Sequence, residues 1–381
     1  MKRLFLLLGM CVCLLTGCMS RRVEEQLLVI IMGVDRTEQA ECILTVKVPS
    51  NNGGESASSS SGEASKGGDQ MGYLTLSATG NNFADALELL MATTPRSLNF
   101  CQVREVVISR DLAQTEECAQ ILQQLYALPR MHTQALVVVC QEDAKAFVEA
   151  QKPYVGSRLS RYIEVSINNY AGKGFVPTTS LSQAVRDMGF GWQDPLLILG
   201  ALPSEESPSP REGNVLDVDV GKLQATSVNA VKLFGAAATD GKKVSGALTG
   251  YEMALIHLVR GNAPSLSLPD EQGFSLSLRA RAPARLTVEE GEKPVLRIVL
   301  MCEVQYNAPH PPDGEKIRQQ LEEDIAAMVQ KLQSMRCDAL GFGGRMVHRF
   351  ATVQEWDAFQ WREKYARADV QVDVQLRLKK E

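Results

Sequence analysis

The pattern of apolar positions in the first half of the chain predicts alternating strands and helices. Apolar runs at residues 27–34, 42–48, 73–78, 103–109 and 133–140 predict strands, most of them buried. Apolar positions with helical spacing predict a helix that begins after a cap at Asn81 or Asn82 and ends near residue 93. They predict further helices at 111–127, 142–150, 159–170 and 181–188. Such alternation is typical of sheets packed by helices, so we expect a mixed α/β (α+β) fold.

The second half predicts a hairpin, three helices and a long terminal strand. Residues 231–238 and 244–248 flank Asp240-Gly241, which is a favoured hairpin turn. A helix capped by Thr249, strands at 274–280, 285–288 and 295–304, and helices at 315–335 and 353–365 follow. Apolar residues of the 315–335 helix recur at spacings of three and four, so one face should pack on its own sheet, with a partner helix as the alternative. Residues 370–378 alternate between apolar and polar, which predicts a strand with one buried face.

Two polar stretches interrupt this pattern and suggest how the chain is divided. Residues 50–72 are rich in Asn, Gly and Ser, and we expect them to form a mobile loop. Residues 203–213 are rich in Pro, Ser and charge, which is typical of a linker. The sequence therefore predicts several domains: an N-terminal region at 18–202, with two subdomains, and a C-terminal domain at 214–381.

The first eighteen residues have the pattern of a bacterial lipoprotein signal peptide. Lys2 and Arg3 precede an apolar run at 4–15, and Leu15-Thr16-Gly17-Cys18 has the form of a lipobox. The apolar run is too short for an uncleaved membrane anchor, which needs about 20 residues. We expect cleavage between Gly17 and Cys18 and a diacylglyceryl group on the Cys18 thiol. The mature protein would be exported and tethered to the membrane.

Composition and cysteine spacing exclude several classes of function. The formal net charge is −5, and removal of Lys2 and Arg3 makes it more negative, which argues against a nucleic-acid partner. Six cysteines remain beyond Cys18, and none is in a C-x-x-C pair or near a histidine at metal-ligand spacing. They are Cys42, Cys101, Cys118, Cys140, Cys302 and Cys337. We expect buried free thiols, with disulfides in an oxidising compartment as the alternative.

The sequence contains no catalytic motif. The loop at 235–243 has five residues between its glycines and a lysine where a phosphate-binding loop has Ser or Thr. Gly341-Phe342-Gly343-Gly344 lacks the dinucleotide-binding spacing and predicts a turn between helices. The four histidines are far apart, and there is no G-x-S-x-G elbow. We therefore expect a protein that is not an enzyme and carries no metal or cofactor other than its lipid.

Several short motifs recur in one order along the chain. Cys18 is followed by Gly33-x-Asp35, where residue types alone indicate a strand-to-turn transition. Motifs at 77–80, 95–100 and 233–248 come next. The strongest one is Cys337-Asp338-Ala339-Leu340-Gly341-Phe342-Gly343, which Trp356 and Trp361 follow. In this order the chain resembles the Ger(x)C family, the lipoprotein C subunits of spore nutrient-germinant receptors. It departs from the family at Met19-Ser20, where relatives usually have Trp-Asp.

The resemblance implies a location, partners and a fold. The protein would lie on the outer face of the spore inner membrane and assemble with integral-membrane A and B subunits. Relatives have a mixed α/β fold in three domains and no assigned enzymatic activity. The resemblance identifies neither the nutrient nor a residue that would contact it. Two other hypotheses remain: a solute-binding lipoprotein of an importer, which needs two similar lobes around a cleft, and an envelope enzyme.

Overall fold

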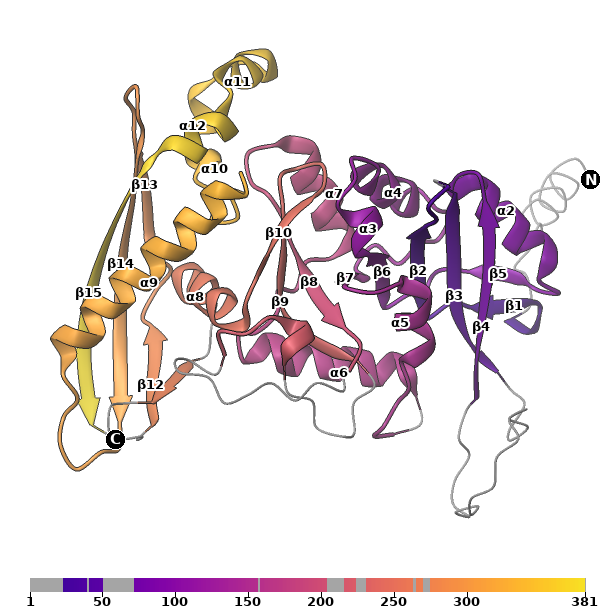
Figure 1. Cartoon of the computed structure of the whole chain (residues 1–381), viewed down its shortest axis with the longest axis horizontal. Helices are drawn as coiled ribbons and strands as arrows, with labels where there is room; N and C mark the ends of the chain where they lie inside the picture. The colour runs from indigo at the N-terminus through magenta and orange to yellow at the C-terminus, as the bar shows by residue number, and fades with distance from the viewer. Residues whose placement is uncertain are drawn as a thin grey trace, which may run out of the picture.

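The computed structural model describes residues 23–39, 41–50, 72–156, 158–203, 216–223, 231–262, 265–269 and 275–380. The body is elongated, with the first strands at one end and the last strands at the other (Figure 1). A short 3₁₀ turn, η1 (Val23–Glu25), leads into β1 (Gln26–Leu28), which pairs in parallel with β5 (Ser97–Asn99).

The N-terminal sheet has eight strands in the order β10-β9-β8-β7-β6-β2-β3-β4. The four central strands β2, β6, β7 and β8 run parallel to their neighbours within this set. The outer pairs β2–β3, β3–β4, β8–β9 and β9–β10 are antiparallel. The strands are β2 (Ile31–Arg36), β3 (Cys42–Ser50), β4 (Gly72–Gly80), β6 (Glu105–Ser109), β7 (Leu136–Cys140), β8 (Leu196–Ala201), β9 (Lys232–Thr239) and β10 (Val244–Leu248). This sheet confirms the expected mixed α/β architecture.

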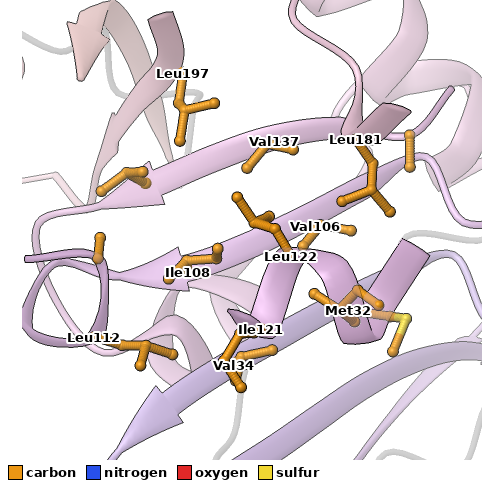
Figure 2. Packing of buried hydrophobic residues seen from close by; sticks show 14 of the residues in the cluster. Met32, Val34, Val106, Ile108, Leu112, Ile121, Leu122, Val137, Leu181 and Leu197 are labelled. Atoms are coloured by element: carbon orange, nitrogen blue, oxygen red, sulfur yellow. The ribbon is translucent and has the colours of Figure 1, made fainter. Parts of the chain in front are cut away.

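Helices cover both faces of this sheet. One face packs against α2 (Phe83–Thr93), α3 (Arg110–Ala113), α4 (Glu117–Tyr126) and α7 (Leu181–Phe190). The other packs against α5 (Ala144–Ala150) and α6 (Leu159–Gly172). Figure 2 shows the first interface, where Met32, Val106 and Val137 of the strands meet helix residues such as Leu112 and Leu122. Burial on both faces explains why the central strands are continuous apolar runs.

The chain returns to the same sheet after the Pro/Ser-rich stretch. The β9–β10 hairpin pairs with β8, and its Asp240-Gly241 turn forms as predicted, with Gly241 at a φ of 88°. The predicted linker, of which residues 204–213 lie outside the described part, thus separates strands that share one sheet. The domain boundary at 203–213 stays a prediction. Residues 51–71 of the predicted loop also lie outside the described part, although Ser50 and Gly72 at its ends are paired.

The C-terminal part is a five-stranded sheet backed by helices. Its long central strand, β14 (Val295–Tyr306), pairs antiparallel with β12 (Ser275–Ala280) and β13 (Arg285–Glu289), and parallel with β15 (Asp369–Lys380). The short β11 (Leu266–Pro269) pairs with β12. The other elements of this part are α8 (Gly250–Arg260), α9 (Gly314–Ser334), α10 (Gly343–Met346), η3 (Val347–Arg349), α11 (Val353–Phe359) and α12 (Trp361–Arg367). The short 3₁₀ turn η2 (Val220–Lys222) instead packs on β8 and β9 of the N-terminal sheet.

Several sequence expectations are confirmed in this part. Thr249 caps α8 in a capping box with Glu252, because its hydroxyl accepts from the Glu252 N–H and the Glu252 carboxylate accepts from the Thr249 N–H. The apolar face of α9, including Leu321, Ile325 and Leu332, packs in the core of its own half. The terminal strand alternates as predicted, with Val374 buried.

Three predicted elements are interrupted. The apolar run 27–34 forms β1 and β2 with a break at residues 29–30, because β1 pairs with β5 while β2 joins the large sheet. The predicted helix 111–127 is divided into α3 and α4. The predicted helix 353–365 is divided at Gln360, whose φ of 51° is incompatible with a continuous right-handed helix.

All six cysteines of the described residues are free thiols, and five of them are buried. Burial raises the pKa of the Cys42 thiol to about 11 and that of Cys118 to about 12. Cys101 is exposed, which differs from the expected pattern. Within the described ranges, no helix is both long and apolar enough to cross a membrane.

Candidate functional site

The strongest sequence motif, residues 337–343, folds around one buried carboxylate. Asp338 is 1% exposed and accepts four hydrogen bonds. Its Oδ1 accepts the backbone N–H groups of Gly341 (2.9 Å) and Phe342 (3.0 Å). Its Oδ2 accepts the Gly343 N–H (2.6 Å) and the Trp361 indole N–H (2.9 Å). The motif is therefore a backbone turn closed on its own aspartate and tied to α12.

A second buried carboxylate, Asp194, connects this turn to the N-terminal sheet. The Asp338 N–H donates to Asp194 Oδ2 (2.9 Å), and the Asp194 N–H donates to the Asp338 carbonyl (3.1 Å). Asp194 also accepts from Arg362 Nη2 of α12 at 2.5 Å. Because Asp194 lies just before β8, these bonds join the start of that strand to elements of the C-terminal half. We call the set Asp194, Asp338, Gly341, Phe342, Gly343, Trp361 and Arg362 the Asp338 joint.

Electrostatics show why the joint requires so many donors. Burial raises the pKa of Asp338 to about 6, while the N–H groups of Gly343, Trp361 and Phe342 lower it. Burial also raises the pKa of Asp194, and Arg362 opposes that shift. Buried carboxylates are costly unless they are paired or hydrogen-bonded. The donors thus allow two carboxylates to lie inside a contact between the halves.

Close packing fixes the remaining positions of the joint. A Cβ on Gly241, at the β9–β10 turn, would lie 1.8 Å from Arg362 Nη2. Arg260 at the end of α8 donates to the Ala339 carbonyl at 2.6 Å. Phe342 is fully buried in the C-terminal core. The start of strand β8, the β9–β10 turn and helices α8 and α12 therefore meet at the turn of residues 337–343, which follows α9 in the chain and lies between the two ends of the body (Figure 1).

Adjacent glycines provide a direct test of this packing. A Cβ on Gly343 would lie 2.5 Å from the Trp192 carbonyl oxygen and 2.7 Å from Trp361 Nε1, whereas nothing lies within 4 Å of a Cβ on Gly344. We expect Gly343→Ala to lower the free energy of unfolding by about 2 kcal/mol, because the backbone oxygen must move. Gly344→Ala, its matched control, should be neutral or stabilising by up to about 1 kcal/mol. Urea denaturation checks both, and equal effects would contradict the packing.

The other predicted motif, Gly33-x-Asp35, makes a separate structure on β2. Asp35 Oδ1 accepts the Ala144 N–H at 2.5 Å and Oδ2 accepts the Lys145 N–H at 2.9 Å. Burial raises the pKa of Asp35, and these two N–H groups oppose the shift. A Cβ on Gly33 would lie 3.0 Å from the Val148 side chain, so the glycine permits close approach of α5. The motif thus fixes the start of α5 on the sheet.

Lys47, which no sequence motif indicated, holds the other end of α5. The Lys47 ammonium donates to the carbonyls of Val148 (2.7 Å), Glu149 (3.2 Å) and Gln151 (2.6 Å). Burial lowers the pKa of Lys47 to about 8. A cation at the carbonyl end and a carboxylate at the N–H end both match the helix dipole. The available signal was a lysine within the apolar run 42–48.

A buried glutamate beside this lysine predicts a pH dependence of stability. Burial raises the pKa of Glu105 from 4.5 to about 7, although the Gln151 amide and Lys47 lower it. Between pH 4.5 and about pH 7, Glu105 keeps its proton in the native state but has released it in the unfolded chain, so the free energy of unfolding falls as the pH rises. We expect Glu105→Gln to match the wild type near pH 4 and to exceed it by up to roughly 3 kcal/mol near pH 8.

Urea denaturation of both proteins at several pH values checks this expectation. Glu88→Gln, at an exposed position of α2, serves as the control and should follow the wild type throughout. If the free energies of unfolding of Glu105→Gln and the wild type changed in parallel between pH 4 and pH 8, Glu105 would not titrate in this range.

The two motifs do not form one site. Asp338 and Gly341–Gly343 meet in the joint, Gly33 and Asp35 meet at α5, and Gly17 and Cys18 lie outside the described residues. An open cavity of about 240 Å³ lies next to Asp35, where Arg36 pairs with Glu117 at 3.3 Å. No cluster of His, Cys, Asp and Glu among the described residues is arranged to hold a metal ion. Both motifs position helices and strands.

Comparisons with known proteins cover both halves. The family model described as "Spore germination protein N-terminal domain" matches residues 20–200, and the one described as "Spore germination B3/GerAC like, C-terminal" matches residues 234–381. A solved structure, "Crystal Structure of the GerBC protein", is similar with a TM-score of 0.53 and 12% identity. The match covers 91% of this chain and 96% of that one, and at this identity it shows a shared fold. Comparison with curated proteins finds no significant match.

Proposed function

Because the chain belongs to the GerAC-like (Ger(x)C) family of spore germination proteins, we propose that it is the lipid-anchored C subunit of a nutrient-germinant receptor. It acts without catalysis, by assembling with integral-membrane A and B subunits. The observation that carries this proposal is the match of both family models, in order, along the two halves of the chain. The family is one of spore germination proteins rather than of enzymes.

The lipobox supports a location for this subunit. Acylation of Cys18 anchors the protein on the outer face of the spore inner membrane, because two acyl chains bind a bilayer far more stably than one. Four residues separate Cys18 from η1. The folded body therefore stays close to the bilayer and to membrane-embedded partners.

The Asp338 joint supports the role of a scaffold. It is buried and carries hydrogen bonds between elements of both halves, so it holds them in a fixed arrangement. Leu216 also packs against both main cores. A body built in this way holds surfaces of both halves at fixed positions relative to the membrane anchor.

The described parts of the chain do not favour the solute-binding alternative. That function needs two similar lobes around a cleft, whereas here an eight-stranded mixed sheet is joined to a five-stranded sheet of different topology.

Affinity purification from detergent-solubilised spore membranes, followed by mass spectrometry, tests the proposal. We expect tagged protein to recover two multi-spanning partners, one of them similar to transporters. Recovery of importer permease and ATPase subunits would replace this proposal with the solute-binding function. Recovery of no membrane protein would contradict both.

A further inference from the structure

Strand β4 is the last strand of the eight-stranded sheet, and among the described strands it has a neighbour on one side only. Within the described residues it pairs only with β3, in a continuous register from Cys42↔Gly80 to Ser50↔Gly72. Alternate residues of such a strand direct their N–H and C=O groups away from the neighbour, so about three residues between 74 and 80 offer both groups to another strand. Helix α2 packs on one face of the β3–β4 pair and α5 approaches the other, which leaves the edge itself between them.

The other edges of the eight-stranded and five-stranded sheets, among the described residues, have features that disfavour strand pairing. Strand β10 is short, has a register shift, and places Gly246 against the Met335 side chain. Strand β15 carries charged residues, and its Val374 N–H donates to Glu322 of α9 at 2.9 Å. Strand β11 has four residues and ends at Pro269, and β13 has charged residues at both ends.

Strand β4 has none of these features. Its nine residues, GYLTLSATG, include no charged residue and no proline, and its pairing has no bulge. Leu74 is 49% exposed, and Ser77 and Thr79 are exposed as well. A long, regular, uncharged edge is a template for an additional strand.

We propose that the β4 edge is a docking site for an extended, uncharged segment of a membrane-embedded partner, which adds as a strand beside β4. This inference rests on the proposed function, because it takes the partner to be one of the receptor's integral-membrane subunits. Backbone hydrogen bonds supply the affinity in this binding mode, and side chains such as Leu74 contribute specificity.

The anchor explains why the occupant comes from the membrane. Gln26 is eight residues after Cys18, so it lies at most roughly 30 Å from the lipid, at up to about 3.6 Å per residue. The Ile30 N–H donates to the Lys47 carbonyl of β3, at 2.9 Å, and β3 is the neighbour of β4. The open edge is thus held near the bilayer surface, within reach of segments that membrane proteins expose there.

Hydrogen exchange of the purified receptor complex tests the pairing without any substitution. We expect those amides of residues 74–80 that point away from β3 to exchange at least about tenfold more slowly in the complex than in the isolated protein, because new hydrogen bonds must open first. Amides of β15 provide the internal control and should exchange equally in both samples. Equal exchange of β4 amides in the two samples would overturn the proposal.

A matched pair of variants tests the same edge. Leu74→Lys places a charge on β4, and Met301→Lys does so at an equally exposed apolar position of β14, where Met301 is 45% exposed. We expect Leu74→Lys to reduce recovery of the partner about tenfold, because a charged edge disfavours an added strand, and Met301→Lys to leave it unchanged. Circular dichroism would verify that both variants fold.

The outcomes separate this proposal from the proposed function. If the wild type recovers no multi-spanning partner, the receptor function itself is wrong. If the wild type and Leu74→Lys recover the partner equally, the complex exists but does not use β4. If cross-linking through β4 joins two copies of this chain, the edge is a self-association site, and the docking proposal is overturned.

Discussion

Replacing Cys18 with alanine should move the protein from the membrane fraction to the soluble fraction and should strongly impair nutrient-triggered germination. In the proposed lipoprotein the Cys18 thiol carries the lipid, and each buried methylene of an acyl chain contributes about 0.8 kcal/mol to membrane binding. No helix among the described residues provides an alternative membrane span. Fractionation with immunoblotting, together with germination assays on the same spores, measures both effects.

Cys101→Ala is the matched control for this experiment. Cys101 is the exposed thiol of the described residues, and its removal should change neither fractionation nor germination. A Cys18→Ala protein that stays in the membrane fraction of spores with normal germination would contradict the lipid anchor. Release from the membrane with normal germination would show that the anchor exists but that assembly does not depend on it.

Replacing Asp338 with alanine should lower the free energy of unfolding by roughly 3–5 kcal/mol, because four buried N–H donors lose their acceptor. The substitution leaves the N–H groups of Gly341, Phe342 and Gly343 and the Trp361 indole without their acceptor. Unpaired buried donors cost about 1–3 kcal/mol each before relaxation. Urea denaturation measures the loss.

Two further variants make the result specific. Asp373→Ala, at an exposed position on β15, should change stability by less than about 0.5 kcal/mol. Asp338→Asn keeps the shape and one acceptor oxygen but directs an amide toward N–H donors, so its stability should fall between those of the wild type and Asp338→Ala. An Asp338→Ala protein as stable as Asp373→Ala would mean that the joint contributes nothing to holding the halves together.

Local signals in the sequence predicted many elements correctly because the forces that form them are local. The Asp240-Gly241 turn requires a residue that tolerates a φ of 88°, and glycine supplies it. The capping box of Thr249 and Glu252 is complete within four residues. Conversely, the break at Gln360 was missed, since periodicity alone does not show where tertiary packing interrupts a helix.

The candidate site was predicted only in part. Sequence motifs identified Asp35 and Asp338 but not what their carboxylates do, because the partners of Asp35 are more than 100 positions away, at Ala144 and Lys145. Asp194 was missed because a single Asp before an apolar run is ordinary in sequence. Its importance follows from Arg362 and from the backbone of Asp338, which are far from it along the chain.

The sequence by itself determined the alternation of strands and helices and the family resemblance, and it carries the lipobox pattern on which the proposed anchor at Cys18 rests, since these depend on residue type and order. The tertiary structure alone decided that the β9–β10 hairpin extends the N-terminal sheet, that two buried aspartates join the halves, and that β4 pairs with β3 alone among the described strands. The physical reason is that hydrogen bonding and burial between distant segments depend on how the sheets are ordered. Local patterns of apolar residues do not fix that order.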